Sequence, residues 1–478
     1  MIAELIGAKL LSPYFGSSLY VWSSVMAITL GGLALGYFTG GRLSTKEKPS
    51  ATLFFILALS GFSLLLMPYL SQLIFPISYQ LPLLPSVIIC TVSTLFFPVF
   101  LMGTVSPLII KILTKEASDS GKRAGEVYAI STVGGIISTF LTGFWLIPIY
   151  GLIYPLVFSG ILILFISLLY LLISKKIFSS AVLLIFSFAF VSLAFSKNKG
   201  DKFTVYKSEG ILGRVEVIEI PIDTLNSKTT ERSLLINNII QTSLNINTGE
   251  STIDYVEVLD KNLNKLSQKN KKALILGLGG GAIANLLIQK GWEVTAVEID
   301  DRIVDVAKKY FSLSPKVKLI IDDARHGLQF AGTDYDLVLF DMYSAEVAPS
   351  HVVSVEAFKE LEKICKPEAT FIFNTYGYLD KAAGLGNLSL LKTLSHLKYE
   401  NKICFHGNEK FADYRGFLIF SSKSFINAEQ TFYNEFFQKE NAEIGTLIKD
   451  DVPILEYQNS LAARKWRFAY IQNFISRR

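Results

Sequence analysis

Six long apolar runs fill the first 195 residues and restrict what this part of the chain can fold into. They cover about residues 18–40, 51–75, 86–110, 127–147, 152–174 and 177–195. A helix needs about 20 apolar residues to cross a hydrocarbon core. None of the runs carries Lys, Arg, Asp or Glu at its centre, which disfavours an ion or proton path. The pattern predicts an α-helical multi-pass transmembrane domain over residues 1–196.

Two shorter features refine this helical domain. Residues 1–18 are too short and too charged for a span, so they are expected to form a helix packed on the bundle. Gly32, Gly36 and Gly40 recur at intervals of four residues and therefore share one helical face. Such spacing lets two helix backbones approach closely. It predicts helix packing rather than a ligand site.

Charge separates the two halves of the chain. Residues 1–195 contain ten Lys/Arg and five Asp/Glu, whereas the remainder contains 36 of each. The excess of positive charge therefore belongs to the apolar half, where basic loops fix membrane orientation. A neutral second half does not fit nucleic-acid binding, which needs a basic face. The three cysteines and four histidines show no metal-ligand spacing, so neither a metal site nor a disulfide framework is expected.

The loop charges conflict over orientation. Basic loops at 42–48 and 111–123 are expected in the cytoplasm, and strict alternation of six spans then places the segment after residue 195 outside. Lys197, Lys199 and Lys202 instead favour the cytoplasm for that segment. One run is therefore expected not to span, and 177–195, with 19 residues, is the first candidate. We expect a cell-membrane protein with its soluble half in the cytoplasm, where its metabolite ligand would be.

The second half has two patterns. "RVEVIEI" at 214–220 alternates apolar and polar residues, and "SLLINNII" at 233–240 follows after a polar turn. These strands predict a small β subdomain over residues 203–256. Apolar strands then alternate with helices, as expected for a parallel sheet covered on both faces. This indicates an α/β Rossmann-like domain over residues 257–478. The expected strands are 273–276, 293–297, 317–321 and 336–340, and the expected helices are 282–290, 301–311 and 354–365.

Glycine and acidic residues end the predicted strands, and ligands of such sheets bind beyond these ends. The first strand ends in Gly277-Leu278-Gly279-Gly280-Gly281, where missing side chains let the backbone approach a nucleoside. The second ends at Glu298, 21 residues after Gly277, where a carboxylate can accept two ribose hydroxyls. The third ends at Asp322-Asp323 and the fourth at Asp341. All of these groups are expected to face one crevice.

Two nucleotide classes fit the glycine loop. Gly277, Gly279 and Ala282, with Glu298, satisfy the dinucleotide fingerprint. That interpretation requires a pyrophosphate on the loop and leaves Asp323 and Asp341 unexplained. An S-adenosyl sulfonium needs no phosphate site, and acidic residues suit its positive charge. The pattern therefore favours an S-adenosyl ligand over NAD.

Some of the acidic residues have a simpler explanation. Asp300 and Asp301 are predicted to cap a helix, and Asp322 is open to the same interpretation.

Three stretches together carry a family resemblance. "LILGLGGGAIANLLIQKGWEVTAVEIDDRIVDVAKKYF", "VKLIIDDAR" and "YDLVLFD" resemble the polyamine aminopropyltransferases, the spermidine synthase family. "SPYFGSSLYVWSSVMAITLGGLALGYFTGGRLS" and "GEVYAISTVGGIISTFLTGFWLIPIYG" resemble the membrane half of its membrane-fused branch. The resemblance implies a methyltransferase-type fold that uses decarboxylated S-adenosylmethionine as a propylamine donor and no separate cofactor.

The resemblance also assigns roles to residues. Gln241 matches a glutamine lining the donor site, and Tyr255 matches the tyrosine of a Tyr-x-Glu motif whose acid is Glu257. Glu298 matches the ribose acid and Asp323 the adenine-side acid. Gly277, Gly279 and Gly281 form the donor loop, and Asp341 matches the catalytic acid opening an Asp-x-x-Asp motif. "DDVP" at 450–453 resembles a C-terminal signature of the fused branch.

Departures from the family pattern concern amine recognition. Gly280 stands where the family has an aspartate that holds the donor's amino group. Ser344 replaces the second acid of Asp-x-x-Asp, which grips the diamine, and Glu346 is a speculative substitute. Val256 replaces a polar residue after the tyrosine.

Three functions remain open on these residues. The first is transfer of propylamine from decarboxylated S-adenosylmethionine to an amine by a membrane-anchored enzyme. The second is another S-adenosylmethionine-dependent transfer, of a methyl or aminocarboxypropyl group. The third is a membrane sensor or transport-associated protein without turnover. The expected partners are the S-adenosyl donor, an amine acceptor and the lipid bilayer, with a homodimer left open and nucleic acid disfavoured.

Overall fold

The structure is a computed structural model that divides into two compact units. One unit comprises Met1–Asp201 with Ser208–Arg214, and the other Lys202–Lys207 with Val215–Arg478. The structure describes residues 1–15, 19–78, 81, 83–196, 203–210, 212–224, 227–264, 271–342, 349–378, 383–406, 414–424, 444–452, 454–455 and 457–463.

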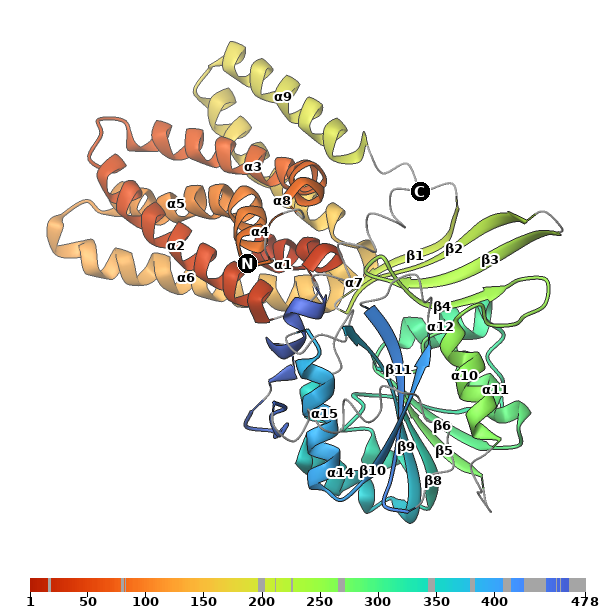
Figure 1. Ribbon diagram of the computed structural model, residues 1–478. Helices are drawn as coiled ribbons and strands as arrows, with labels where there is room; N and C mark the ends of the chain where they lie inside the picture. Colours follow the sequence, from red (N-terminus) through yellow and green to blue (C-terminus); the bar gives the residue numbers. More distant parts are fainter. Residues whose placement is uncertain are drawn as a thin grey trace. The chain divides into compact units, whose positions relative to one another are not determined.

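The first unit is helical up to Ser196, and the described residues of the six predicted apolar runs lie almost entirely in helices, as expected (Figure 1). Two of its long helices contain a π-helical turn, η1 or η3, each followed within two residues by a proline. The helices and turns are α1 (Ile2–Phe15), α2 (Leu19–Leu43), α3 (Pro49–Ser78), α4 (Leu83–Thr91), η1 (Val92–Phe96), α5 (Phe97–Leu113), η2 (Ala117–Asp119), α6 (Ser120–Leu141), η3 (Thr142–Leu146), α7 (Ile147–Tyr150), α8 (Ile153–Ile173) and α9 (Ile177–Ser196).

Five helices within the described residues are long and apolar enough to cross a membrane. In α9, which runs over 20 residues, the side chains that the structure describes give an apolar helix of Phe178–Ser192. That residues 177–195 do not span therefore stays a prediction. The five candidate spans are Val21–Leu43, Pro49–Phe75, Leu84–Leu113, Ala117–Tyr150 and Ile153–Ile173.

The glycine stripe on α2 packs against α5, which confirms the packing prediction. A Cβ atom added to Gly36 would lie 2.4 Å from the carbonyl oxygen of Phe100. One added to Gly40 would lie 2.6 Å from the carbonyl oxygen of Thr104. Only glycine permits this backbone contact, because any side chain would separate the two helices.

The second unit begins with a four-stranded sheet in the order β1-β2-β3-β4 (Figure 1). Its strands are β1 (Thr204–Gly210), β2 (Gly213–Thr224), β3 (Ser227–Ile236) and β4 (Ile239–Asn245). The stretch 233–240, expected as one strand, is instead a hairpin, and that expectation was wrong. Asn237 and Asn238 adopt φ values of 50° and 68°, the left-handed pair required by a two-residue hairpin turn.

A seven-stranded sheet follows in the order β10-β11-β9-β8-β5-β6-β7. Strands β5 to β9 pair in parallel, whereas β11 runs antiparallel to both of its neighbours. The chain order reverses between β5 and β8, which is where ligands bind in such sheets. The strands are β5 (Lys272–Leu276), β6 (Glu293–Glu298), β7 (Lys318–Ile321), β8 (Tyr335–Phe340), β9 (Cys365–Tyr378), β10 (Glu400–His406) and β11 (Tyr414–Ser422).

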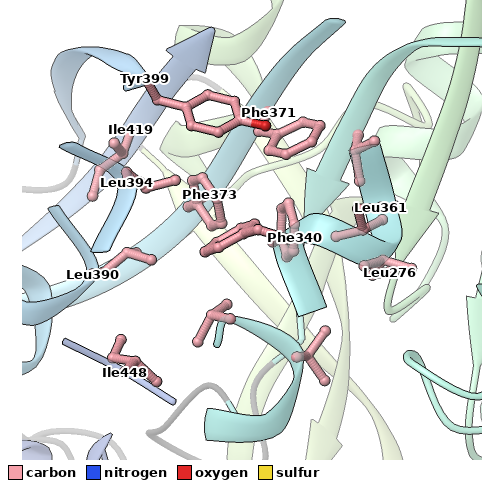
Figure 2. Close-up of a cluster of buried hydrophobic side chains, with 14 of the residues drawn as sticks. Leu276, Phe340, Leu361, Phe371, Phe373, Leu390, Leu394, Tyr399, Ile419 and Ile448 are labelled. Atoms are coloured by element: carbon pink, nitrogen blue, oxygen red, sulfur yellow. The ribbon is translucent and has the colours of Figure 1, made fainter. Parts of the chain in front are cut away.

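Helices cover both faces of this sheet, as predicted for a Rossmann-like domain. One core lies under α10, α11 and α12, and the other under α13, α14 and α15 (Figure 1). Figure 2 shows the second core, where Phe340 of β8 stacks on Phe373 of β9 with ring centroids 4.2 Å apart. The helices are α10 (Asp254–Leu263), α11 (Ala282–Gln289), α12 (Asp301–Tyr310), α13 (Leu328–Ala331), α14 (Val355–Glu362) and α15 (Leu385–His396), with a 3-10 turn η4 (Ser350–Val352).

Candidate active site

The loops after β5 and β8 touch at the switch point of the sheet. Gly277 has a φ of 90°, and a Cβ atom there would lie 2.3 Å from the carbonyl oxygen of Asp341. The Asp341 backbone N–H in turn donates to the carbonyl of Leu276. The sequence needs glycine at 277 because the left-handed conformation and the close approach both exclude a side chain. This contact brings the glycine loop and Asp341 together at the switch point of the sheet.

Asp341 is held from two sides. The Tyr255 hydroxyl donates to its Oδ2 at 3.2 Å, and the Asn374 amide donates to its Oδ1 at 2.8 Å. The carboxylate retains some exposure to solvent, but surrounding atoms enclose it deeply. Burial raises the pKa of the Asp341 carboxyl, while the bonds from Asn374 and Tyr255 oppose the rise. Because a carboxylate has about four acceptor positions, it can still accept a proton or bind a cation.

The aromatic core sets the direction of these two side chains. Phe340 pairs with Phe373 in the parallel register of β8 and β9, and their rings stack in Figure 2. Asp341 follows the last residue of β8 and Asn374 is the next residue of β9, so their side chains lie next to each other on neighbouring strands. Burial, followed by the nearby Asp341 charge, raises the pKa of the Tyr255 hydroxyl well above its usual value. Tyr255 consequently stays protonated and remains a donor to Asp341.

Glu298 ends β6 beside the glycine loop. One carboxylate oxygen accepts from the Leu278 backbone at 2.9 Å, and the other accepts from the Asp300 backbone at 3.0 Å. Burial raises the pKa of Glu298, and these backbone N–H groups oppose the rise. The carboxylate is thereby fixed on the loop with acceptor capacity to spare for two hydroxyls. Asp300 caps α12 by accepting from Arg302, as predicted.

The rest of the glycine loop packs tightly on its surroundings. The Gly280 N–H donates to the Thr242 hydroxyl at 2.8 Å. A Cβ at Gly280 would lie 2.7 Å from the Thr242 methyl group and 3.1 Å from the Phe311 ring. Gly279 and Gly281 adopt φ values of 53° and 81°. The loop is thus built for glycine at each of these positions.

The comparisons with known proteins concern this part of the chain. A family model described as "Spermine/spermidine synthase domain" matches residues 255–380, which include Tyr255, the glycine loop, Glu298, Asp323 and Asp341. This region belongs to the spermidine synthase family.

Two curated relatives of the synthase domain differ in their named chemistry. The chain is 30% identical over 115 residues to a polyamine aminopropyltransferase of Vibrio vulnificus, covering 23% of this chain and 38% of the relative. It is 30% identical over 110 residues to an N-terminal histidine N-methyltransferase of Emericella nidulans, covering 22% of this chain and 20% of the relative. The matched region therefore spans less than half the length of either relative.

A solved structure is also similar to the chain. It is a probable spermidine synthase from Corynebacterium glutamicum, 15% identical, with a TM-score of 0.41, and the alignment covers 52% of this chain and 94% of that one.

The carboxylate of Asp323, a predicted site residue, is already engaged in hydrogen bonds. Asp323 accepts from the backbones of Arg325 and His326, and its other oxygen lies 3.1 Å from His351. Although burial opposes it, these bonds lower the pKa of Asp323. Asp323 therefore orders the turn after β7, and an adenine amino group would have to share it with His351.

Other sequence matches lie at the margin of the site. The Gln241 side-chain amide donates weakly, at 3.4 Å, to the carbonyl of Ile239, and its neighbour Thr242 contacts the glycine loop. Glu257 of the Tyr-x-Glu motif is exposed and pairs with Lys261, so it does not join Asp341. Ser344 and Glu346 lie outside the described residues.

The sequence interpretation missed four residues that the fold brings to the site. Asn374 and Tyr376 lie in the last five residues of β9, and His406 is the last residue of β10. Neither strand was among those predicted. The same rule, polar residues ending apolar strands, would have found them. Ile299 follows Glu298 directly, yet 52% of its surface is exposed, which suits an apolar ligand face.

No metal site is apparent within the described ranges, where no group of three or more His, Cys, Asp or Glu residues could hold an ion.

Proposed function

We propose that the chain transfers an aminopropyl group from decarboxylated S-adenosylmethionine to an amine. The single observation that carries this proposal is Asp341, enclosed at the switch point, held by Tyr255 and Asn374, and touching the glycine loop. A protein that only bound the nucleoside would gain nothing from a half-buried carboxylate at this position, where no contact with adenine or ribose is predicted.

The chemistry follows from a nucleophilic displacement. The amine must be neutral to attack, and Asp341 is placed to accept its proton or to orient it. The amine nitrogen forms a bond to the carbon beside the sulfonium, the carbon–sulfur bond breaks, and its electron pair returns to sulfur. The products are an aminopropylated amine and methylthioadenosine, and the released proton passes to Asp341 or to water. Holding both reactants in one crevice supplies much of the remaining acceleration.

Product identification tests this function. Purified full-length chain, incubated with decarboxylated S-adenosylmethionine and 1,4-diaminobutane, should release methylthioadenosine at a rate that depends on both compounds. Release of S-adenosylhomocysteine from intact S-adenosylmethionine would point to methyl transfer instead. If neither methylthioadenosine nor S-adenosylhomocysteine is released, the sensor interpretation is favoured.

Gly280 supports a second candidate, a transferase that uses intact S-adenosylmethionine. The family's aspartate at this position would attract the donor's amino group and repel a carboxylate. Here Thr242 and Phe311 crowd the Gly280 Cα, so an acid does not fit without displacing them. The loop therefore lacks the element that excludes the carboxylated donor.

Weak donor discrimination is the expected consequence of this glycine. An interaction with a charged group contributes roughly 1.5–3 kcal/mol, and this chain lacks the one that the aspartate would make with the donor's amino group. Calorimetric titration of the full chain with both donors should therefore give dissociation constants within about tenfold of each other. A preference of several hundredfold for the decarboxylated donor would show that another residue does the aspartate's work.

We also propose that the helical unit anchors the enzyme in the cell membrane. We propose five spans, an arrangement in which the basic loops near 42–48 and 111–123 lie on the same side as the chain after Ile173. The parity conflict of six spans disappears, and the synthase domain lies in the cytoplasm.

Partition into detergent tests the anchor. The full chain should sediment with membranes and require detergent for extraction, because its candidate spans expose many large apolar side chains. A fragment beginning at Phe203 should remain in the supernatant. Full-length protein that stays soluble after high-speed centrifugation without detergent would contradict the membrane assignment.

A further inference from the structure

Three strands align a tyrosine, a glycine and a histidine in one row. Tyr376 of β9 pairs with Gly416 of β11, and Gly416 pairs with His406 of β10. Paired residues point to the same face of a sheet, so the two rings meet across the glycine, with centroids 5.2 Å apart. A Cβ at Gly416 would lie 2.0 Å from the His406 ring. Glycine at 416 therefore creates the space that the imidazole occupies.

The row faces Tyr255 of α10. Its ring centroid lies 5.6 Å from that of His406, and its hydroxyl is the donor to Asp341. Asn374, two residues before Tyr376 on β9, lies on the same face and donates to the other oxygen of Asp341. The side chains of Asn374, Tyr255 and His406 thus form one wall, which contacts Asp341 through Asn374 and Tyr255.

Two polar atoms in this wall lack a partner. Across the parts of the chain that the structure describes, the Asn374 Oδ1 and the His406 Nε2 make no hydrogen bond. Both side chains are more than nine-tenths buried, with 5% and 6% exposure. Leaving a buried polar atom unpaired costs about 1–3 kcal/mol. Such a cost is understandable where a ligand completes the bonds.

The imidazole is neutral in this setting. Burial lowers the pKa of His406 to about 3. The titratable groups facing it are the Tyr255 and Tyr376 hydroxyls, with Asp341 behind Tyr255, while β11 presents only Gly416. A neutral imidazole protonated on Nδ1 offers Nε2 as a hydrogen-bond acceptor.

We propose that His406 and Asn374 complete the binding site for the reacting amine, with the Nε2 and Oδ1 atoms accepting hydrogen bonds beside the Asp341 carboxylate. This inference rests on the proposed transfer to an amine. A primary ammonium carries three N–H donors. The His406 Nε2, the Asn374 Oδ1 and the Asp341 carboxylate together offer three acceptor groups, of which only the carboxylate is charged. The remaining wall is aromatic, as suits a cation close to the faces of tyrosine rings. His406 would therefore select for an amine at this position. As a neutral acceptor it would hold the amine's proton less tightly than a second carboxylate would.

The test compares amine binding with donor binding. Full-length chain in detergent is loaded with methylthioadenosine and titrated calorimetrically with 1,4-diaminobutane. His406→Phe keeps a ring but removes the nitrogen, and should weaken amine binding by roughly ten- to a hundredfold, the range for a hydrogen bond to a charged group. Methylthioadenosine affinity should change by less than about twofold. His406→Gln, which returns an amide near the Nε2 position, should recover most of the loss.

Matched variants separate the outcomes. His396→Gln, at the exposed end of α15, should leave amine binding unchanged. If the unmutated chain binds no amine and forms no product, the proposed function itself fails. If it binds the amine and His406→Phe binds it equally well, the function stands and the role of His406 is wrong. Parallel loss of amine and nucleoside affinity in both His406 variants would also overturn it. If the phenylalanine variant does not fold, His406→Leu, which also removes the nitrogen, replaces it: weaker amine binding supports the role of His406, and unchanged amine binding overturns it.

Discussion

Asp341→Asn should lower the turnover number by roughly two to four orders of magnitude, the scale of a positioned acid–base group. Asparagine keeps the size of the side chain and can still pair with Tyr255, but it removes the charge that accepts the amine's proton. Donor affinity, carried by Glu298 and the glycine loop, should change by less than about tenfold. Initial rates with both substrates and a donor titration measure the two effects on the same preparation.

Asp336→Asn is the matched control on the same strand. Asp336 is also a buried aspartate of β8, but it accepts from the Lys272 backbone and pairs with Lys366 at the opposite end of the strand. Its replacement should reduce thermal stability while leaving turnover within about threefold, since it lies away from the reacting groups. Near-full turnover in Asp341→Asn would remove the acid–base role from this account.

Gly277→Ala should abolish measurable donor binding, with a loss of at least roughly a hundredfold, and destabilise the synthase domain. A left-handed conformation costs an alanine about 1–2 kcal/mol, and the added methyl group would overlap the Asp341 carbonyl, at about 1–3 kcal/mol more. The two loops would separate, so the glycine loop and Asp341 would no longer share the crevice. Donor calorimetry and thermal unfolding would show both effects.

Gly291→Ala provides the comparison. Gly291 has a similar φ of 79°, but a Cβ there meets no atom within 4 Å. Its replacement should therefore show only the conformational cost, with donor affinity unchanged. Equal donor affinity in the Gly277 and Gly291 variants would mean that contact between the two loops is unimportant for binding.

Strand ends made much of the site predictable. Each parallel strand of the sheet is a short apolar run with a distinct polar ending, so Gly277, Glu298 and Asp341 could be assigned to one edge before any coordinates were considered. The same periodicity placed the helices around the sheet and identified the apolar helices of the first unit. Local patterns were sufficient because these features depend on residues close together in the chain.

The remaining contacts depend on register between distant segments. His406 meets Tyr255 only because β11 returns between β9 and β10 and presents Gly416 to the imidazole. No local pattern encodes that row of three strands. The Asn237-Asn238 turn was missed for a different reason. The apolar residues on both sides of it predict a single strand unless the preference of asparagine for the left-handed conformation is taken into account.

Mass spectrometry of the amine after reaction tests the central claim most directly. Unmutated full-length chain is incubated with 1,4-diaminobutane and either decarboxylated or intact S-adenosylmethionine, with Asp341→Asn in parallel. The account predicts a diamine extended by one aminopropyl group, formed from the decarboxylated donor and strongly reduced in the variant. A methylated or aminocarboxypropylated amine, or a diamine that remains unchanged under all conditions, would contradict it.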